Sequence, residues 1–309
     1  MVAVTDPVLV DRRLMLVHAH PDDETIGNGV TMAAYAAAGA AVTLVTCTLG
    51  EEGEVLVPEL EHLGADHDDT LGPHRLGELE LAMSALGVTD FVRLGGDFRY
   101  RDSGMAYDDR RRAVARDVLR EGIFWTTDLL SAANELVPLI RDRRPQVLIT
   151  YNEVGGYGHP DHVQAHRVAM YAYQLAGVPS YRPDLGPAWQ VSRVLWNTMS
   201  RQHVRQGIEA LRAAGDTEAF AGWDVDDDDM PMISGEADIA VEIAGEEHVE
   251  AKIKAMLAHS TQITADGPFF AGAEVLGHQM WAREHYRFVA GVPFPATDGW
   301  ADDLFAGLS

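Results

Sequence analysis

Two short stretches of the sequence, HAHPDDE and GYGHPDH, carry residues that could hold a metal ion. In the first, His20 and Asp23 stand three positions apart, and in the second His159 and His162 have the same spacing. Zinc accepts imidazole and carboxylate ligands together, and a site with three protein ligands leaves a fourth position for water or substrate. These stretches therefore predict a catalytic metal site, whose donors would suit iron(II) as well as zinc.

The two adjacent carboxylates of the first stretch, Asp22 and Asp23, indicate a division of roles, because neighbouring side chains diverge. One would bind the metal, and the other would be the general base for a water whose pKa the metal lowers. In the second stretch His159, if it is not a ligand, could stabilise an oxyanion or protonate a leaving group, with Asp161 orienting an imidazole. Each His-Pro-Asp could instead be a helix N-cap, with Asp22 or Asp161 as the capping residue. Two such stretches together favour the metal site.

The residues around these stretches alternate between strand-like and helix-like patterns. Apolar, β-branched runs predict strands at residues 13–17, 41–48, 90–94 and 146–151. Apolar residues at helical spacing, bounded by Gly or Pro, predict helices at residues 28–38, 74–86, 128–143 and 161–175. Strands that alternate with helices form right-handed βαβ units. The expected fold class is therefore α/β, a Rossmann-like, mostly parallel sheet with helices on both faces.

The segments that follow the four predicted strands hold most of the polar residues of this half of the chain. They read HAHPDDE, LGEEGE, GGDFRYRDSGM and NEVGGYGHPDH, in chain order. Ligands of such sheets bind beyond the carboxyl ends of the strands. The four segments are therefore expected to converge at one edge of the sheet and to form an active site there.

From about residue 177 the pattern loosens into a smaller, mixed α+β C-terminal part. Strands are predicted at residues 192–198 and 238–243, and helices at residues 201–213 and 246–259. We expect a metal-dependent core over residues 1–178, with residues 179–309 packing on it and shaping the pocket. The acidic run at residues 224–229 indicates a solvated loop, because like charges repel. A calcium site is the alternative, although the glycine-turn spacing of a known calcium loop is missing.

The strongly acidic composition limits the kinds of partner that the chain is expected to bind. The chain of 309 residues has 24 Lys and Arg against 48 Asp and Glu, a net charge of −24. Nucleic acids and anionic membranes are therefore unexpected partners, since cationic residues drive binding to both. Residues 25–50 carry no formal charge, but their glycines favour a buried helix and strand over a membrane span. The one cysteine, Cys47, excludes a Cys-rich metal site and is expected to be a buried thiol. No secretory signal is recognised, so a cytoplasmic protein is expected.

The HPDDE and HPDH motifs resemble those of the zinc-dependent de-N-acetylases of the N-acetylglucosaminyl-phosphatidylinositol deacetylase (PIG-L-like) superfamily. Within it, the segments VHAHPDDE, VTCTLGEEGEV, RLGEL, RDSGM and GGYGHPDH are similar, in this order, to the deacetylases of mycothiol biosynthesis. Those enzymes remove acetate from N-acetylglucosaminyl-inositol. The resemblance covers about residues 14–178 and implies an amide hydrolysis by water that one zinc ion per chain activates.

The resemblance also implies a role for individual residues, first at the reacting centre and then in the pocket. The implied centre has the zinc ligands His20, Asp23 and His162, the general base Asp22, the oxyanion-stabilising His159 and Tyr157, and Asp161 as support for His159. The implied sugar and inositol pocket has Glu54, Arg75, Asp102 and Met105. On residue type alone, an arginine such as Arg75 is more often solvated, and Met105 more often lies in the core. His18 and His166 are the competing ligands.

Four other functions compete with this one. A membrane-bound glycolipid deacetylase is disfavoured, because no anchor helix is recognised and the net charge of −24 repels anionic lipid. An amidase of mycothiol S-conjugates shares the metal motif, but its pattern carries a lysine where this chain has Gly27. A zinc-stabilised, non-catalytic sugar-binding protein would have no need of Asp22 as a spare base. A metallophosphoesterase would usually need more carboxylates bridging two metals.

Overall fold

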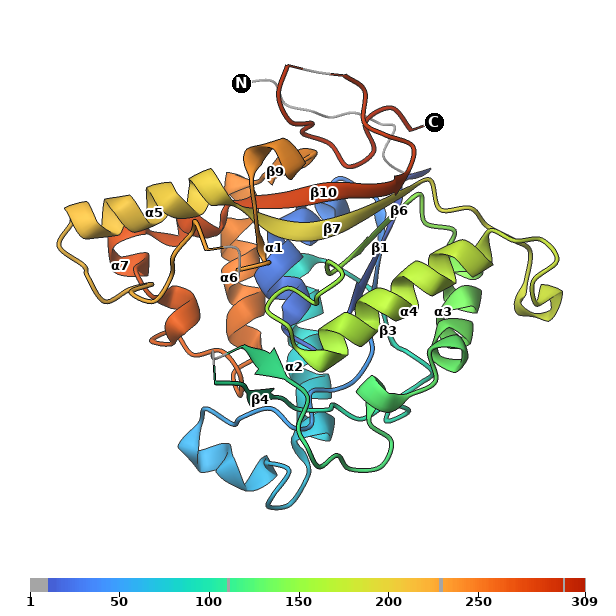
Figure 1. Ribbon diagram of the computed structural model, residues 1–309, viewed down its shortest axis with the longest axis horizontal. Coiled ribbons are helices and arrows are strands. Elements are labelled where there is room, and N and C mark those ends of the chain that lie inside the picture. Colours follow the sequence, from blue (N-terminus) through green and yellow to red (C-terminus); the bar gives the residue numbers. More distant parts are fainter. Residues whose placement is uncertain (1–10, 110–111, 228–229, 297, 309) are drawn as a thin grey trace.

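A computed structural model describes residues 11–109, 112–227, 230–296 and 298–308 of the chain. Its centre is one eight-stranded sheet, in which the strand order is β3-β2-β1-β6-β7-β10-β9 and β8 pairs with β7 (Figure 1). In that order the strands are β3 (Asp90–Arg93), β2 (Ala41–Thr46), β1 (Arg13–His18), β6 (Val147–Thr150), β7 (Arg193–Ser200), β10 (Arg283–Gly291), β9 (Val241–Ala244) and β8 (Ile233–Ser234). Two further short strands, β4 (Ala106–Tyr107) and β5 (Ala113–Val114), pair with each other.

The sheet is parallel from β3 to β7, and only β10 and β9 run antiparallel to their neighbours. The chain adds β2 and β3 on one side of β1 and then returns to add β6 and β7 on the other side. The strand order therefore reverses between β1 and β6. In open parallel sheets this reversal leaves a crevice at the carboxyl ends of the two strands, where ligands bind.

Helices cover both faces of the sheet, as the alternating pattern predicts (Figure 1). One face carries α1 (Asp23–Ala37), α2 (Leu71–Leu86) and α6 (Val249–Ala258). The other face carries α3 (Leu129–Arg143) and α4 (Pro160–Ala176). Two helices of the C-terminal part, α5 (Arg201–Ala213) and α7 (Ala273–Leu276), contact each other.

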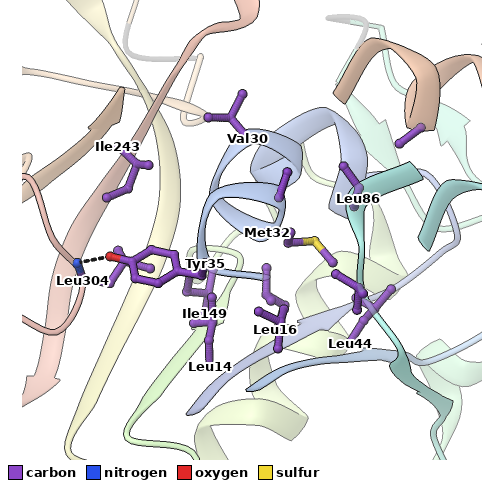
Figure 2. Close-up of a cluster of buried hydrophobic side chains, with 14 of the residues drawn as sticks. Leu14, Leu16, Val30, Met32, Tyr35, Leu44, Leu86, Ile149, Ile243 and Leu304 are labelled. Carbon is purple, nitrogen blue, oxygen red and sulfur yellow. Dashed lines mark hydrogen bonds between the residues drawn. The ribbon is translucent and has the colours of Figure 1, made fainter. Parts of the chain in front are cut away.

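Side-chain alternation along β1 assigns its residues to two separate cores. Leu14 and Leu16 pack under α1, where Figure 2 shows Val30 and Met32 above them. Met15 and Val17, which alternate with them, belong to the core under α3 and α4. Successive side chains of a strand point to opposite faces, so a strand covered on both sides is apolar at every position. Tyr35 of α1 extends this core toward the C-terminus, because its hydroxyl accepts a hydrogen bond from the Leu304 N–H (2.7 Å, Figure 2).

The α/β fold class is confirmed, and the differences from the predicted elements are local. Helix α1 begins at Asp23, five residues before the predicted start, because the Asp-Asp-Glu of the motif itself forms the first turn. The strand predicted at 41–48 ends at Thr46, and Cys47 just beyond it is buried, which raises the pKa of its thiol. Gly39 stands beyond the end of α1 with φ +86°, a conformation that suits glycine. Within the described residues, no helix is long and apolar enough to cross a membrane.

The strands of the C-terminal part continue the same sheet. β7 pairs parallel with β6, and β10, which the sequence pattern does not reveal, pairs with β7. A buried ion pair between Lys252 and Glu284 (2.7 Å) ties α6 to β10. The division at residues 178/179 stays a prediction. In the acidic run, Asp226 is exposed and pairs with Arg205, while residues 228–229 lie outside the described part of the chain.

Candidate active site

The two His-Pro-Asp stretches lie on either side of the point where the strand order reverses. The first follows β1 and runs into α1, and the second precedes α4 after the loop that leaves β6. His20 and His162 are 142 residues apart in the sequence, yet their ring nitrogens approach within 3.3 Å. The predicted convergence of these segments at one sheet edge is therefore present.

The start of α4 sets the orientation of His159. This residue is the N-cap, Pro160 follows at the first helical position, and the Nδ1 atom of His159 accepts a hydrogen bond from the Asp161 N–H (3.1 Å). The cap is thus an imidazole and not the carboxylate of Asp161. Because Nδ1 accepts, the ring proton of a neutral His159 resides on Nε2. Burial and the nearby His20 lower the pKa of His159 well below its ordinary value, which favours this neutral form.

Three donor atoms form a nearly equilateral triangle where the two His-Pro-Asp stretches meet. His20 Nδ1, Asp23 Oδ2 and His162 Nε2 are 3.3 Å apart along each of the three edges. Tetrahedral zinc with bonds of roughly 2.0–2.1 Å requires ligand atoms about 3.3–3.4 Å apart. The triangle therefore fits a small divalent metal, and it consists of the three residues that the resemblance implies as ligands.

Each donor of the triangle is held by a further group. The Tyr151 hydroxyl donates to Asp23 Oδ2 (2.7 Å), and the Tyr151 ring stacks on the ring of His162 with centroids 4.3 Å apart. On the far side of its ring, His20 Nε2 lies 3.4 Å from the carboxylates of both Asp102 and Asp161. Metal-bound histidines ordinarily donate their second N–H to such a carboxylate.

The electrostatics of the triangle favour positive charge. Burial by itself lowers the pKa of His20, but Asp102, Asp161 and Asp23 outweigh burial and raise this pKa well above its ordinary value. Burial likewise tends to raise the pKa of Asp23, yet His162 and His20 hold it well below its usual range. The carboxylates around His20 therefore favour a positive charge at this site.

Asp22 precedes the donor Asp23 in the chain, but its carboxylate contacts Arg75 and is not part of the triangle. Its Oδ2 accepts a hydrogen bond from Arg75 Nη2 (2.8 Å), and Arg75 also donates to the carbonyl oxygens of Gly50 and Pro21. Arg75 is 2% exposed, so the solvated alternative for this residue is wrong. Burial raises the pKa of Asp22 to about 6, although the guanidinium acts in the opposite direction. A carboxylate with such a pKa suits a general base near neutral pH.

The carboxylate of Asp161 has partners other than the expected His159. It accepts hydrogen bonds from the N–H (2.8 Å) and the hydroxyl of Ser103, and it faces His20. The contact between Asp161 and His159 runs instead through the Asp161 backbone N–H. Asp102 accepts from the N–H groups of Glu52 and Gly104, and its carboxylate meets His20 at Nε2, on the side of the ring away from the triangle.

The remaining implied residues are Tyr157, Glu54 and Met105. Tyr157 is 41% exposed, with its ring centroid 5.1 Å from that of His162 and 6.2 Å from that of His159. Glu54 is exposed, and its carbonyl accepts from the side chain of Gln262. Met105 is half-buried just before β4, and its carbonyl accepts from Arg116.

Neither competing histidine belongs to the triangle. His18 Nε2 contacts the side chain of Asn28 (2.9 Å), and burial lowers the pKa of His18 to about 4. His166 Nδ1 contacts the Tyr151 carbonyl (3.0 Å) on the same helix as His162. Sequence reasoning missed Tyr151 and Ser103, both of which contact ligands or their supports. Each carries a signal: Tyr151 is the polar last residue of a predicted apolar strand, and Ser103 stands in the segment RDSGM that follows another strand.

Comparison with known proteins yields consistent similarities. The family model described as GlcNAc-PI de-N-acetylase matches residues 15–173. A protein of Nocardioides sp., named 1D-myo-inositol 2-acetamido-2-deoxy-alpha-D-glucopyranoside deacetylase, is 55% identical over 96% of this chain and 99% of its own length. A protein of Geodermatophilus obscurus with the same name is 57% identical over 96% of this chain and 98% of its own. The N,N'-diacetylchitobiose deacetylase of Pyrococcus horikoshii shares the fold, with a TM-score of 0.58 at 16% identity over 90% of this chain and 84% of its own.

Proposed function

The chain belongs to the GlcNAc-PI de-N-acetylase family, and from this premise we propose that it hydrolyses the acetamide of 1D-myo-inositol 2-acetamido-2-deoxy-alpha-D-glucopyranoside. The products would be acetate and the free amino sugar, as in mycothiol biosynthesis. The observation that carries the proposal is the triangle of His20, Asp23 and His162 with the spare carboxylate of Asp22 beside it. The near-full-length relatives that bear this substrate in their names support the choice of sugar.

The three donors of the triangle would hold one divalent metal, zinc or iron(II), since imidazole and carboxylate suit both. When bound, the metal lowers the pKa of its water to about 7 and polarises the amide carbonyl. The carboxylates of Asp102 and Asp161 would keep His20 oriented for this task through its second ring nitrogen. Tyr151 would do the same for Asp23.

The proton transfers would fall to groups outside the triangle. Asp22 takes a proton from the attacking water as the new C–O bond forms. The Nε2–H of His159, whose Nδ1 is occupied by the Asp161 N–H, donates to the oxyanion of the tetrahedral intermediate. When the C–N bond breaks, the proton held by Asp22 goes to the departing amine, and acetate is left. Tyr157, at the exposed rim, would position the carbonyl.

The amidase alternative is disfavoured by the surroundings of Gly27. A Cβ atom added at Gly27 would lie 2.8 Å from Asn197 Nδ2, so a lysine there would require Asn197 to move. The relatives of 55–57% identity are also named as deacetylases. The net charge of −24 supports a small neutral substrate, and we place the reaction in the cytoplasm.

The test is acetate release from N-acetylglucosaminyl-inositol by the purified chain, measured as isolated, after chelation, and after reloading with zinc or iron(II). We expect activity to disappear on chelation and to return with metal, while circular dichroism shows that the fold persists throughout. Faster turnover of a mycothiol S-conjugate than of the sugar would move the assignment to the amidase. Binding of the sugar without release of acetate would instead support the non-catalytic sugar-binding protein.

A further inference from the structure

Asp22 has a backbone conformation that few residues other than glycine adopt. Its φ is +115° at the start of α1, a strained conformation that persists only where the surrounding structure holds it. A return to negative φ would swing the side chain away from Arg75, its partner at 2.8 Å. The place of the Asp22 carboxylate therefore depends on whatever holds its backbone.

Glu24 holds the backbone of Asp22 from one side. Its Oε2 atom accepts a hydrogen bond from the Asp22 N–H (2.9 Å), although Glu24 lies two residues later in the helix. The Asp22 carbonyl is held as well, because it accepts from the N–H groups of Thr25 and Ile26 (3.0 and 3.1 Å). The backbone of Asp22 is thus held at both its N–H and its carbonyl, and the hold on the N–H depends on the carboxylate of Glu24.

The Glu24 carboxylate is in turn fixed by a residue of the C-terminal part. His259 Nε2 lies 3.0 Å from Glu24 Oε1, and both side chains are 0% exposed. Within the described part of the chain, the Nδ1 atom of His259 has no hydrogen-bond partner, so Glu24 is the contact that this imidazole serves. An unpaired carboxylate at this depth would be strongly disfavoured.

His259 is itself held in place by its own segment. His259 is the C-cap of α6, and its N–H donates to the Met256 carbonyl (3.1 Å). Two residues later, the N–H and the hydroxyl of Thr261 both donate to the Glu78 carboxylate (2.8 Å each). Glu78 belongs to α2, the helix that also carries Arg75. The backbone and the carboxylate of Asp22 are therefore anchored on one connected framework.

We propose that Glu24 and His259 are positioning residues for Asp22: they hold its backbone in the strained conformation that places its carboxylate against Arg75, beside the donor triangle. The inference rests on the proposed role of Asp22 as the general base. It gives the C-terminal part a specific contribution to the reaction, since His259 lies 235 residues beyond Glu24. Neither residue has to touch the substrate.

The test compares replacements of His259 that differ in reach. The amide of His259→Gln places an N–H near the position of Nε2, His259→Asn places it near Nδ1, and His259→Leu has none. We expect kcat to fall about 10- to 100-fold in the Leu and Asn variants with KM within twofold. The Gln variant should stay within about threefold of the wild-type kcat, and every variant should retain one metal per chain. A matched control is His285→Leu, since His285 pairs with Glu242 (2.9 Å) away from the site.

Combination with Asp22→Asn separates positioning from a merely structural role. If His259 acts through Asp22, His259→Leu should change the residual kcat of Asp22→Asn by less than about twofold. Equal losses in the two backgrounds, or wild-type kcat in both His259→Leu and His259→Asn, would overturn the inference. Should the Leu variant fail to fold, the Gln and Asn pair still decides, because equal kcat in these two would refute it. Wild-type kcat in Asp22→Asn alone would instead overturn the base assignment of the proposed function.

Discussion

Arg75 Nη2 lies 2.8 Å from Asp22 Oδ2, and the guanidinium that makes this contact is 2% exposed. The guanidinium also donates to the carbonyl oxygens of Gly50 and Pro21. The space is filled so closely that a Cβ atom added at Gly50 would lie 1.8 Å from Arg75 Nη1. The resemblance implies that Arg75 lines the substrate pocket, and this geometry adds a contact with the carboxylate of Asp22, the proposed general base.

The first prediction follows from that contact. Arg75→Lys keeps the charge but cannot serve three acceptors with the same fork of N–H groups. We expect kcat to fall at least about 10-fold with little change in KM, because Asp22 loses its orientation and the substrate loses no contact. Steady-state kinetics checks this, with metal content as the control. An effect mainly on KM would show that Arg75 binds the sugar.

The second prediction separates the two adjacent carboxylates. Asp22→Asn should keep its metal and lose on the order of 10²–10⁴ in kcat, because an amide cannot accept the proton of water. Asp23→Asn should lose metal affinity first, since Asp23 Oδ2 is a corner of the donor triangle. Metal analysis and turnover at increasing added zinc distinguish the two, and added metal should partly rescue only Asp23→Asn. The reverse pattern would exchange the two roles.

A third prediction concerns two histidines one turn apart on α4. His162→Ala removes a corner of the triangle and should abolish both metal binding and acetate release. His166→Ala is the matched control, because His166 contacts only the Tyr151 carbonyl and the Trp196 ring among the described contacts. We expect it to keep one metal per chain. Full metal occupancy in His162→Ala would show that the ligand assignment is wrong.

The fourth prediction concerns pH and stability away from the site. Asp90 accepts hydrogen bonds from Arg143 Nε and Nη2 (3.2 Å each) and from Thr43 (2.8 Å). Although burial tends to raise the pKa of Asp90, these bonds lower it overall. The folded state therefore prefers the ionised form, and the resulting stability is present above pH ~4 and is lost as the pH falls through the lowered pKa.

Asp90→Asn should accordingly lower the free energy of unfolding at pH 7 by roughly 0.5–1 kcal/mol, a small value because the pair is partly exposed. The difference from the wild type should shrink toward zero as the pH falls well below about 4. Urea unfolding at several pH values measures it, and Asp142→Asn, at a more exposed neighbour of Arg143, is the control. A difference independent of pH would show that the charge of Asp90 contributes nothing.

Local patterns in the sequence were sufficient to predict the fold class, the four strands and four helices predicted for the first half of the chain, and the residue types of the candidate metal site. Apolar periodicity is a property of consecutive residues, so β1, β6 and α4 lie close to their predicted bounds. The same holds for His20 and Asp23, which are three residues apart and share one turn. Strand alternation then implies that the two His-Pro-Asp stretches meet at one sheet edge.

Only the tertiary structure decided how these residues are held. Tyr151 reaches Asp23 across 128 residues, Ser103 reaches Asp161 across 58, and His259 reaches Glu24 across 235. The burial of Arg75 and the strand β10 likewise depend on what the folded chain places against them. The physical reason is that a hydrogen bond between distant residues depends on the packing of whole helices and strands, and no spacing along the chain records that packing.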